Sequence, residues 1–100
     1  MPIIVVHGAV VASPDTLCEL SALCVDHVVR SRAEPGCISH EVAADAQDPM
    51  RLVFFERWES LEALKTHFKV PASNAFMRGA RALAVRAEPM VIYEAEAVRV

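Results

Sequence analysis

The chain has 100 residues, of which 54% are hydrophobic and 23% are charged, and its formal net charge is -3. This length and composition predict a single globular domain over residues 1–100 rather than a disordered chain. Since no basic stripe is present to neutralise phosphates, nucleic acid is excluded as the main ligand. A chain of this size buries only about two-thirds of the surface that it exposes when unfolded. Because its apolar fraction is high, we expect a partner subunit to cover part of the surface.

The start of the chain does not resemble a signal peptide, because no positively charged segment precedes its first apolar run. No apolar run approaches the roughly 18 residues that a membrane-spanning helix needs, so we expect no membrane partner. Cys18, Cys24 and Cys37 are irregularly spaced, which is typical of reduced thiols and not of a disulfide framework. The cytoplasm is therefore the expected location.

The first third of the chain predicts a strand followed by a helix. Residues 3–12 are apolar on both faces of a strand, so we expect both faces to be covered. Ser13 and Pro14 are typical of a helix start, and the helix is expected to run to about Ser31 with His27 at the surface. The predicted core stripe of this helix consists of Leu17, Leu20, Cys24 and Val28.

A break and a hairpin follow this helix. Pro35 cannot continue a helix, and Gly36 frees the backbone for a turn. Residues 37–44 predict a second strand. Residues 45–50 are rich in Asp and Pro, and they predict a turn that joins this strand to the next one as a hairpin.

The stretch from Arg51 to Phe68 changes from the period of a strand to the period of a helix. Ser60 is a good N-cap residue and marks the change. After it, Leu61, Leu64 and Phe68 recur at helical spacing as expected core positions. The side chains that share one face of the preceding strand are Leu52, Phe54, Glu56 and Trp58.

The last third predicts another helix and a final strand. The helix is expected from Ala72 to about Val85, and the strand from Met90 to Val98. A local group of arginines is interpreted as a solvated helix face. These arginines are Arg78, Arg81 and Arg86.

The predicted element order is therefore β-α-β-β-α-β. This order is typical of the ferredoxin-like α+β fold, an antiparallel four-stranded sheet with both helices on one face. The helices can cover only one face, yet the strands are apolar on both. Two sheets packed face to face in a two-fold homodimer would cover the second face, so we expect a homodimer.

Several short motifs resemble the antibiotic biosynthesis monooxygenase family, which includes small quinol monooxygenases. The matching segments are 34–37 (E-P-G-C), 56–60 (E-R-W-E-S), 62–63 (E-A) and His67, and the resemblance extends over essentially the whole chain. It implies a dimeric α+β barrel. It also implies oxidation of phenolic or quinol-like substrates by molecular oxygen without a metal, flavin or haem. Related members isomerise or cleave small metabolites, and a separate branch degrades haem.

Cofactor-free oxygenation needs a base that deprotonates the substrate and a mostly dry pocket that stabilises the oxyanion. The imidazole of His67 titrates near neutrality and could be this base, and by position the resemblance implies that His67 lies at the pocket. It also implies that Trp58 lies at the pocket, where it could stack on a planar ring and donate through its indole N–H. Each expected site residue could instead be a core residue. The expected substrate-binding residues are Phe54, Glu56, Phe68, Phe76, Met77, Tyr93, His7 and His40.

No cofactor or metal ion is expected from the motifs. The four His and three Cys residues do not show the spacing of a known metal motif, so a metal site could arise only by tertiary convergence. There is no glycine-rich phosphate loop and no nucleophile elbow.

Three functional hypotheses remain open. The first is a monooxygenase that oxidises a quinol or polycyclic phenol with molecular oxygen. The second is an isomerase or tautomerase of a small oxo-metabolite, which needs the same His67 but no oxygen. The third is a non-catalytic ligand-binding dimer, which is favoured by two departures from the family pattern. Ala72 rather than His follows Pro71, and Phe54 stands where some monooxygenases carry Asn.

Overall fold

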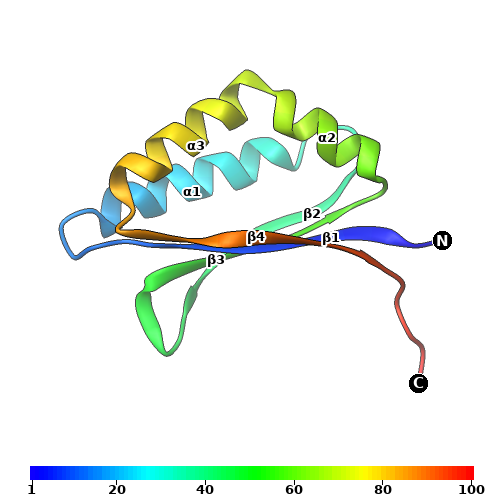
Figure 1. Ribbon diagram of the computed structural model, residues 1–100, viewed down its shortest axis with the longest axis horizontal. Coiled ribbons are helices and arrows are strands. Elements are labelled where there is room, and N and C mark those ends of the chain that lie inside the picture. The colour runs from blue at the N-terminus through cyan, green and yellow to red at the C-terminus, as the bar shows by residue number, and fades with distance from the viewer.

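The computed structural model describes all 100 residues of the chain as one layer of sheet and one layer of helices (Figure 1). The strands form one antiparallel sheet in the order β2-β3-β1-β4, and the helices lie on one face of it (Figure 1). This arrangement confirms the ferredoxin-like fold. The elements are β1 (Ile3–Val11), α1 (Leu17–Ser31), β2 (Cys37–Asp45), β3 (Asp48–Trp58), α2 (Leu61–Lys69), α3 (Pro71–Leu83) and β4 (Arg86–Ala95). No helix combines the length and the apolar character that a membrane span needs.

Several element boundaries differ from the sequence-based expectation. Helix α1 begins at Leu17 instead of Ser13, because Ser13 to Thr16 form a separate turn in which the Thr16 hydroxyl accepts from the Ser13 N–H at 3.0 Å. The expected six-residue turn over 45–50 is only two residues long. The ladder between β2 and β3 continues down to the pair Asp45–Asp48, and this pairing takes up most of the predicted turn.

The last strand also begins earlier than expected, at Arg86, and includes Pro89. Proline is tolerated there because β4 is an edge strand and its register against β1 shifts between His7 and Ala9. Gly8 lies opposite this irregularity, where an added Cβ would sit 3.7 Å from the Met90 backbone. The irregular edge therefore brings Met90 close to β1.

The core lies between the inner face of β3 and the helices. The alternation predicted for β3 is confirmed, because its four inner side chains are all buried. The expectation for His27 was wrong, since this side chain is buried on the inner side of α1. The largest fully buried side chains around this layer are Trp58, Leu20, Leu64, His40 and Val6.

The inner face of α2 is also rotated from its predicted position. The Ser60 side chain accepts from the Ala63 N–H at 3.1 Å, which confirms Ser60 as the N-cap. From this start, His67 lies three residues after the buried Leu64 and turns inward, with 4% of its surface exposed. Phe68, an expected core position, is 39% exposed. The helix therefore buries His67 and leaves Phe68 partly exposed.

Arg51 connects β2, β3 and β4 at one end of the sheet. Its guanidinium donates two hydrogen bonds of 2.7 Å to the Glu88 carboxylate and one of 3.1 Å to Asp45. The hydrogen bonds from Arg51 hold the pKa of Glu88 at about 2, below its ordinary value of 4.5. The pKa of Asp45 is lowered as well, first by the Gln47 N–H and then by Arg51.

Glu88→Gln is expected to make the protein less sensitive to acid. Above pH 4.5 Glu88 is ionised in the folded and the unfolded chain, and its contribution to stability is fully present. As the pH falls from 4.5 to about 2, only the unfolded chain takes up a proton, so the free energy of unfolding decreases. The variant lacks this part of the decrease. The loss of stability is measured as the midpoint of urea unfolding at a series of decreasing pH values, followed by Trp58 fluorescence. Glu94→Gln, on the same strand, is the control. An unchanged acid profile in Glu88→Gln would contradict the assignment.

The three cysteines are free thiols in different environments. Cys18 is exposed, whereas Cys24 is buried in α1 and burial raises its pKa to about 12. We therefore expect iodoacetamide at mildly alkaline pH to alkylate Cys18 quickly and Cys24 hardly at all, because the thiolate is the reactive form. Mass spectrometry of tryptic peptides measures both rates, and unfolding in guanidinium should make both residues react. Equal labelling of the two thiols in the folded protein would show that α1 does not bury Cys24.

Candidate active site

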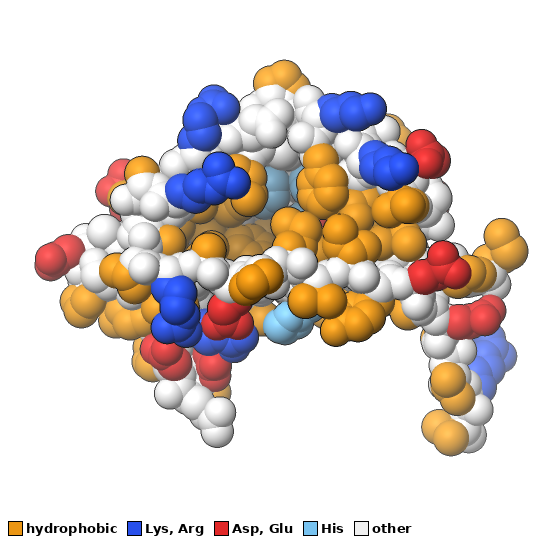
Figure 2. All heavy atoms as spheres, viewed as in Figure 1, with side chains coloured by type: hydrophobic (Ala, Val, Ile, Leu, Met, Phe, Trp, Pro, Cys, Tyr) orange, Lys and Arg blue, Asp and Glu red, His pale blue; other side chains and the backbone are white.

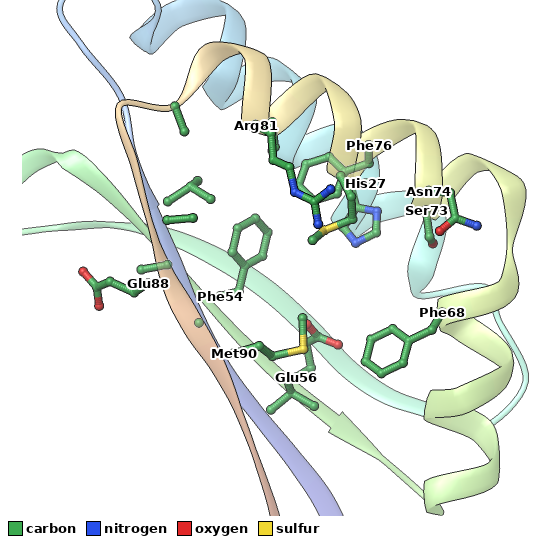
Figure 3. A pocket seen from close by; sticks show the side chains of 18 of the residues that line it. His27, Phe54, Glu56, Phe68, Ser73, Asn74, Phe76, Arg81, Glu88 and Met90 are labelled. Atoms are coloured by element: carbon green, nitrogen blue, oxygen red, sulfur yellow. The ribbon is translucent and has the colours of Figure 1, made fainter.

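A cavity of about 490 Å³ lies between the helices and the sheet. Figure 2 shows it as a hollow with apolar walls and with histidine in its depth. Phe54 forms part of its floor, Phe76 comes from α3, and Phe68 lies on α2 (Figure 3). Met77 on α3 and Met90 on β4 are also lining residues. The volume is within the range of about 300–1,000 Å³ that is common for small-molecule sites.

His67 is held by a carboxylate from the turn between α1 and β2. Its Nδ1 lies 2.7 Å from Oε1 of Glu34. Because a carboxylate only accepts, Nδ1 carries the proton and donates it to this hydrogen bond. The lone pair of the neutral ring is therefore on Nε2. Since His67 lines the cavity, this nitrogen is available to take a proton from a ligand.

The turn that carries Glu34 can lie against α2 because of Gly36. Gly36 has a φ of 82°, and a Cβ at this position would lie 2.5 Å from the Cβ of Ala63. A hydrogen bond of 2.8 Å from the Glu59 N–H to the Gly36 carbonyl joins this turn to the start of α2. The E-P-G motif therefore has a structural role, which is to bring a carboxylate to His67.

A second carboxylate, the buried Glu56, lies on the inner face of β3. The indole N–H of Trp58 donates to its Oε1 at 2.9 Å, and Nε2 of His40 lies 3.3 Å from the same oxygen. Burial by itself would raise the pKa of Glu56, but His40 and Trp58 outweigh it, so the pKa lies below its ordinary value. Glu56 is therefore an anion at neutral pH, and it lines the cavity.

His27 on α1 completes the buried polar layer. Its ring stacks on Phe76 with 4.0 Å between ring centroids, and its Nδ1 accepts from the Arg30 guanidinium at 2.7 Å. Burial, followed by the charges of His40, His67 and Arg30, lowers the pKa of His27 to about 3. The ring is therefore neutral. The spacing could have predicted this inward position, because His27 lies three residues after Cys24 and seven after Leu20.

The structure brings most of the expected site residues together and leaves others outside. Trp58 does not line the cavity: it is fully buried, its N–H is bonded to Glu56, and its ring lies 4.7 Å from that of His67. It thus supports the site from behind and is not available to stack on a ligand. His40 is likewise buried behind the wall. The expected residues that line the cavity are Phe54, Glu56, His67, Phe68, Phe76 and Met77.

His7 and Tyr93 lie on the opposite face of the sheet. His7 is exposed and is paired in register with Phe55 and Val91, and Tyr93 follows two residues after Val91 on the same face of β4. These two expected substrate-binding residues do not line the cavity, because strand alternation places Val6 on the inner face of β1. Glu34, His27 and Arg81 were not among the expected site residues, yet Glu34 bonds His67, and His27 and Arg81 line the cavity. Arg81 was expected on a solvated helix face.

Comparisons with known proteins agree with this fold. A model of the antibiotic biosynthesis monooxygenase family matches residues 3–79. The structure is similar to that of a candidate antibiotic biosynthesis monooxygenase from Deinococcus radiodurans, with a TM-score of 0.91, 27% sequence identity and coverage of 97% of each chain. It is also similar to Rv0793 from Mycobacterium tuberculosis, with a TM-score of 0.80 and 27% identity over 100% of this chain and 98% of that chain.

One relative is similar over most of the sequence. The uncharacterized protein sll1783 of Synechocystis sp. is 34% identical over 91 residues, which is 91% of this chain and 62% of that protein. The chain thus spans about three-fifths of the length of this curated relative. Since the family model covers most of the sequence and the fold agrees over nearly the whole chain, the protein belongs to the antibiotic biosynthesis monooxygenase family.

Proposed function

We propose that the protein is a cofactor-independent monooxygenase that oxidises a quinol or a polycyclic phenol with molecular oxygen. The observation that carries this proposal is the pair of His67 and Glu34 at the wall of an apolar cavity. A histidine whose Nδ1–H is bonded to a carboxylate is oriented as a general base at Nε2. Family membership and the description of the Deinococcus radiodurans protein support the same reaction class.

The proposed reaction starts with proton transfer from the phenolic hydroxyl to Nε2 of His67. The resulting phenolate donates one electron to oxygen, and the two radicals combine to form a carbon–oxygen bond. The oxygenated carbon then loses its hydrogen as a proton, and the O–O bond breaks. One oxygen atom stays on carbon as a carbonyl, and the other leaves as water. The substrate supplies all the electrons, so the reaction needs no external reductant.

The cavity walls fit an aromatic anion. Phe54, Phe68 and Phe76 offer ring faces and edges against which a planar substrate can pack (Figure 3). The Arg81 side chain extends from α3 toward the cavity, where its charge can stabilise a phenolate (Figure 3). The carboxylate of Glu56 would repel the same anion, which favours a pose with the phenolic oxygen near His67 and away from Glu56.

We also propose that the protein functions as a homodimer in the cytoplasm. The outer face of the sheet has no helix over it (Figure 1) and carries the partly exposed apolar side chains of Phe55, Val91 and Tyr93. A second copy packed on this face would remove them from water.

His67→Ala should lower kcat/KM for oxygen uptake about 100-fold or more, because general base catalysis typically contributes about 10²–10⁴. The measurement is oxygen consumption by chelator-treated protein with a panel of hydroquinones and polycyclic phenols. Lys65→Ala removes an exposed side chain from the same helix and is the matched control. No uptake by the wild type above the uncatalysed rate would contradict the proposal. Turnover of an oxo-compound under anaerobic conditions would instead support an isomerase.

Glu34→Gln should lower kcat about tenfold to 100-fold while changing KM little, since the substituted amide no longer favours one tautomer of His67. The amide nitrogen of the substituted side chain can donate to Nδ1 of His67, which leaves the ring proton on Nε2 and removes the lone pair that acts as the base. The control is Glu62→Gln, which removes an exposed carboxylate from α2. Full activity in Glu34→Gln would show that the carboxylate does not orient the base.

A further inference from the structure

Three histidines from three different elements converge beside the cavity. His27 from α1, His40 from β2 and His67 from α2 are all buried, and one ring nitrogen of each lies within 4.8 Å of the other two. Their ring centroids are 5.2 to 5.5 Å apart. Three imidazoles around one zinc ion, each with a metal–nitrogen bond of about 2.0–2.1 Å, have their nitrogens roughly 3.4 Å apart. Small rotations of these side chains would bring the nitrogens to that spacing.

The surroundings of this three-histidine cluster are those of a metal site. Glu34 accepts from Nδ1 of His67 at 2.7 Å, and Glu56 lies 3.3 Å from Nε2 of His40. Carboxylates in these positions orient histidine ligands and increase their basicity, and two carboxylates balance the charge of a divalent cation. Histidines that bind a metal in proteins almost always have such an outer hydrogen-bond partner.

His40 adds an independent observation. Its side chain is 0% exposed, yet Nδ1 has no partner in the protein, and Nε2 has only the Glu56 oxygen at 3.3 Å, without the geometry of a hydrogen bond. Leaving a buried polar group without a partner is costly, and such groups in folded proteins usually have a functional explanation. A cation held by the cluster would supply the partner that this ring lacks.

We propose that His27, His40 and His67 bind one divalent transition-metal ion, with Zn²⁺ as the best-fitting ion. Three neutral imidazoles are suitable ligands for zinc and poor ligands for Mg²⁺ or Ca²⁺. Because His27 and His67 also line the cavity, a fourth coordination position faces the space where a ligand would bind. A lone pair engaged by the metal cannot take a proton, so the loaded site is inactive in the proposed cofactor-free oxygenation.

Arg30 controls access to this site. It donates to Nδ1 of His27, which leaves the ring proton on Nε2. If Nδ1 of His27 binds the metal, Arg30 must release it first. If Nε2 binds the metal instead, the proton on Nε2 must move to Nδ1, and Arg30 must again release Nδ1. Arg30 is partly exposed, so its side chain has room to move away. The proposal therefore predicts tighter metal binding when Arg30 is removed.

The test titrates metal-stripped full-length protein with Co²⁺ and Zn²⁺, and needs no substrate. We use a Cys18→Ser background, because the exposed thiol of Cys18 is itself a possible ligand. The expected result is one Co²⁺ per chain with the visible absorption of a low-symmetry site, displaced by one equivalent of Zn²⁺. His27→Gln, His40→Gln and His67→Gln should each weaken Zn²⁺ binding about 100-fold or more in calorimetry. His7→Gln, which changes an exposed histidine outside the cluster, should leave binding unchanged.

Arg30→Leu is expected to increase the affinity for Zn²⁺, and a misfolded variant would not show such an increase. It should tighten Zn²⁺ binding about tenfold, whereas Arg99→Leu, which removes an equal charge near the chain end, should not. Absence of stoichiometric binding to the wild type would overturn the proposal. It would also be overturned if binding were lost in His7→Gln but kept in the three cluster variants. Neither result bears on oxygen uptake by the stripped protein, so the two proposals can fail separately.

Discussion

The hydrogen bond between Glu34 and His67 is the interaction on which the site depends. It joins Glu34 in the turn after α1 to His67 in the last turn of α2, two residues that are 33 positions apart in the sequence. A carboxylate or a histidine placed alone in this interior would lose its hydration without compensation. Together they satisfy each other and also define which ring nitrogen is free. The same contact therefore stabilises the approach of α2 to the sheet and prepares the proposed base.

The polar side chains inside this small hydrophobic core are connected by hydrogen bonds and ring contacts. Glu56 accepts from Trp58 and lies beside His40, while His27 stacks on Phe76 and accepts from Arg30. The two carboxylates and the three histidines thus occupy one connected region in which each anion has a donor. His27 stays neutral because burial and its neighbours oppose a further positive charge. The chain has only a small core in which to hide these groups, which indicates that the site and the fold constrain each other.

The two proposals concern the same lone pair. In the oxygenation proposal, Nε2 of His67 takes a proton from a phenol in the cavity. In the metal proposal, a ring nitrogen of His67 binds an ion together with His27 and His40. These states exclude each other because one lone pair cannot serve both. The hydrogen bond from Arg30 to His27 favours the metal-free state, since it leaves the proton on the nitrogen opposite Nδ1. The environment of α1 would thus decide how readily the site changes between a base and a metal centre.

The hydrophobic periodicity of the sequence and the residues that begin or end its elements were sufficient to predict the fold. The alternation through Phe54, Glu56 and Trp58, the N-cap at Ser60 and the break at Pro35 and Gly36 are local signals, because each reflects the conformation of a few neighbouring residues. They identified the order of the elements, the side chains that share one face of β3, and His67 as a candidate site residue. The motif around Glu34 was also visible, although its carboxylate had no assigned role.

Only the tertiary structure determined which side chains meet. His7 and His40 are both strand histidines, yet strand pairing places the first on the outer face and the second in the core. A rotation of α2 by one residue relative to the expected stripe buries His67 and leaves Phe68 partly exposed at the cavity. The convergence of His27, His40 and His67 depends on the packing of α1, β2 and α2 against each other. Such contacts have no local signature, because the residues that form them are distant in the sequence and their distances are set by the packing of whole elements.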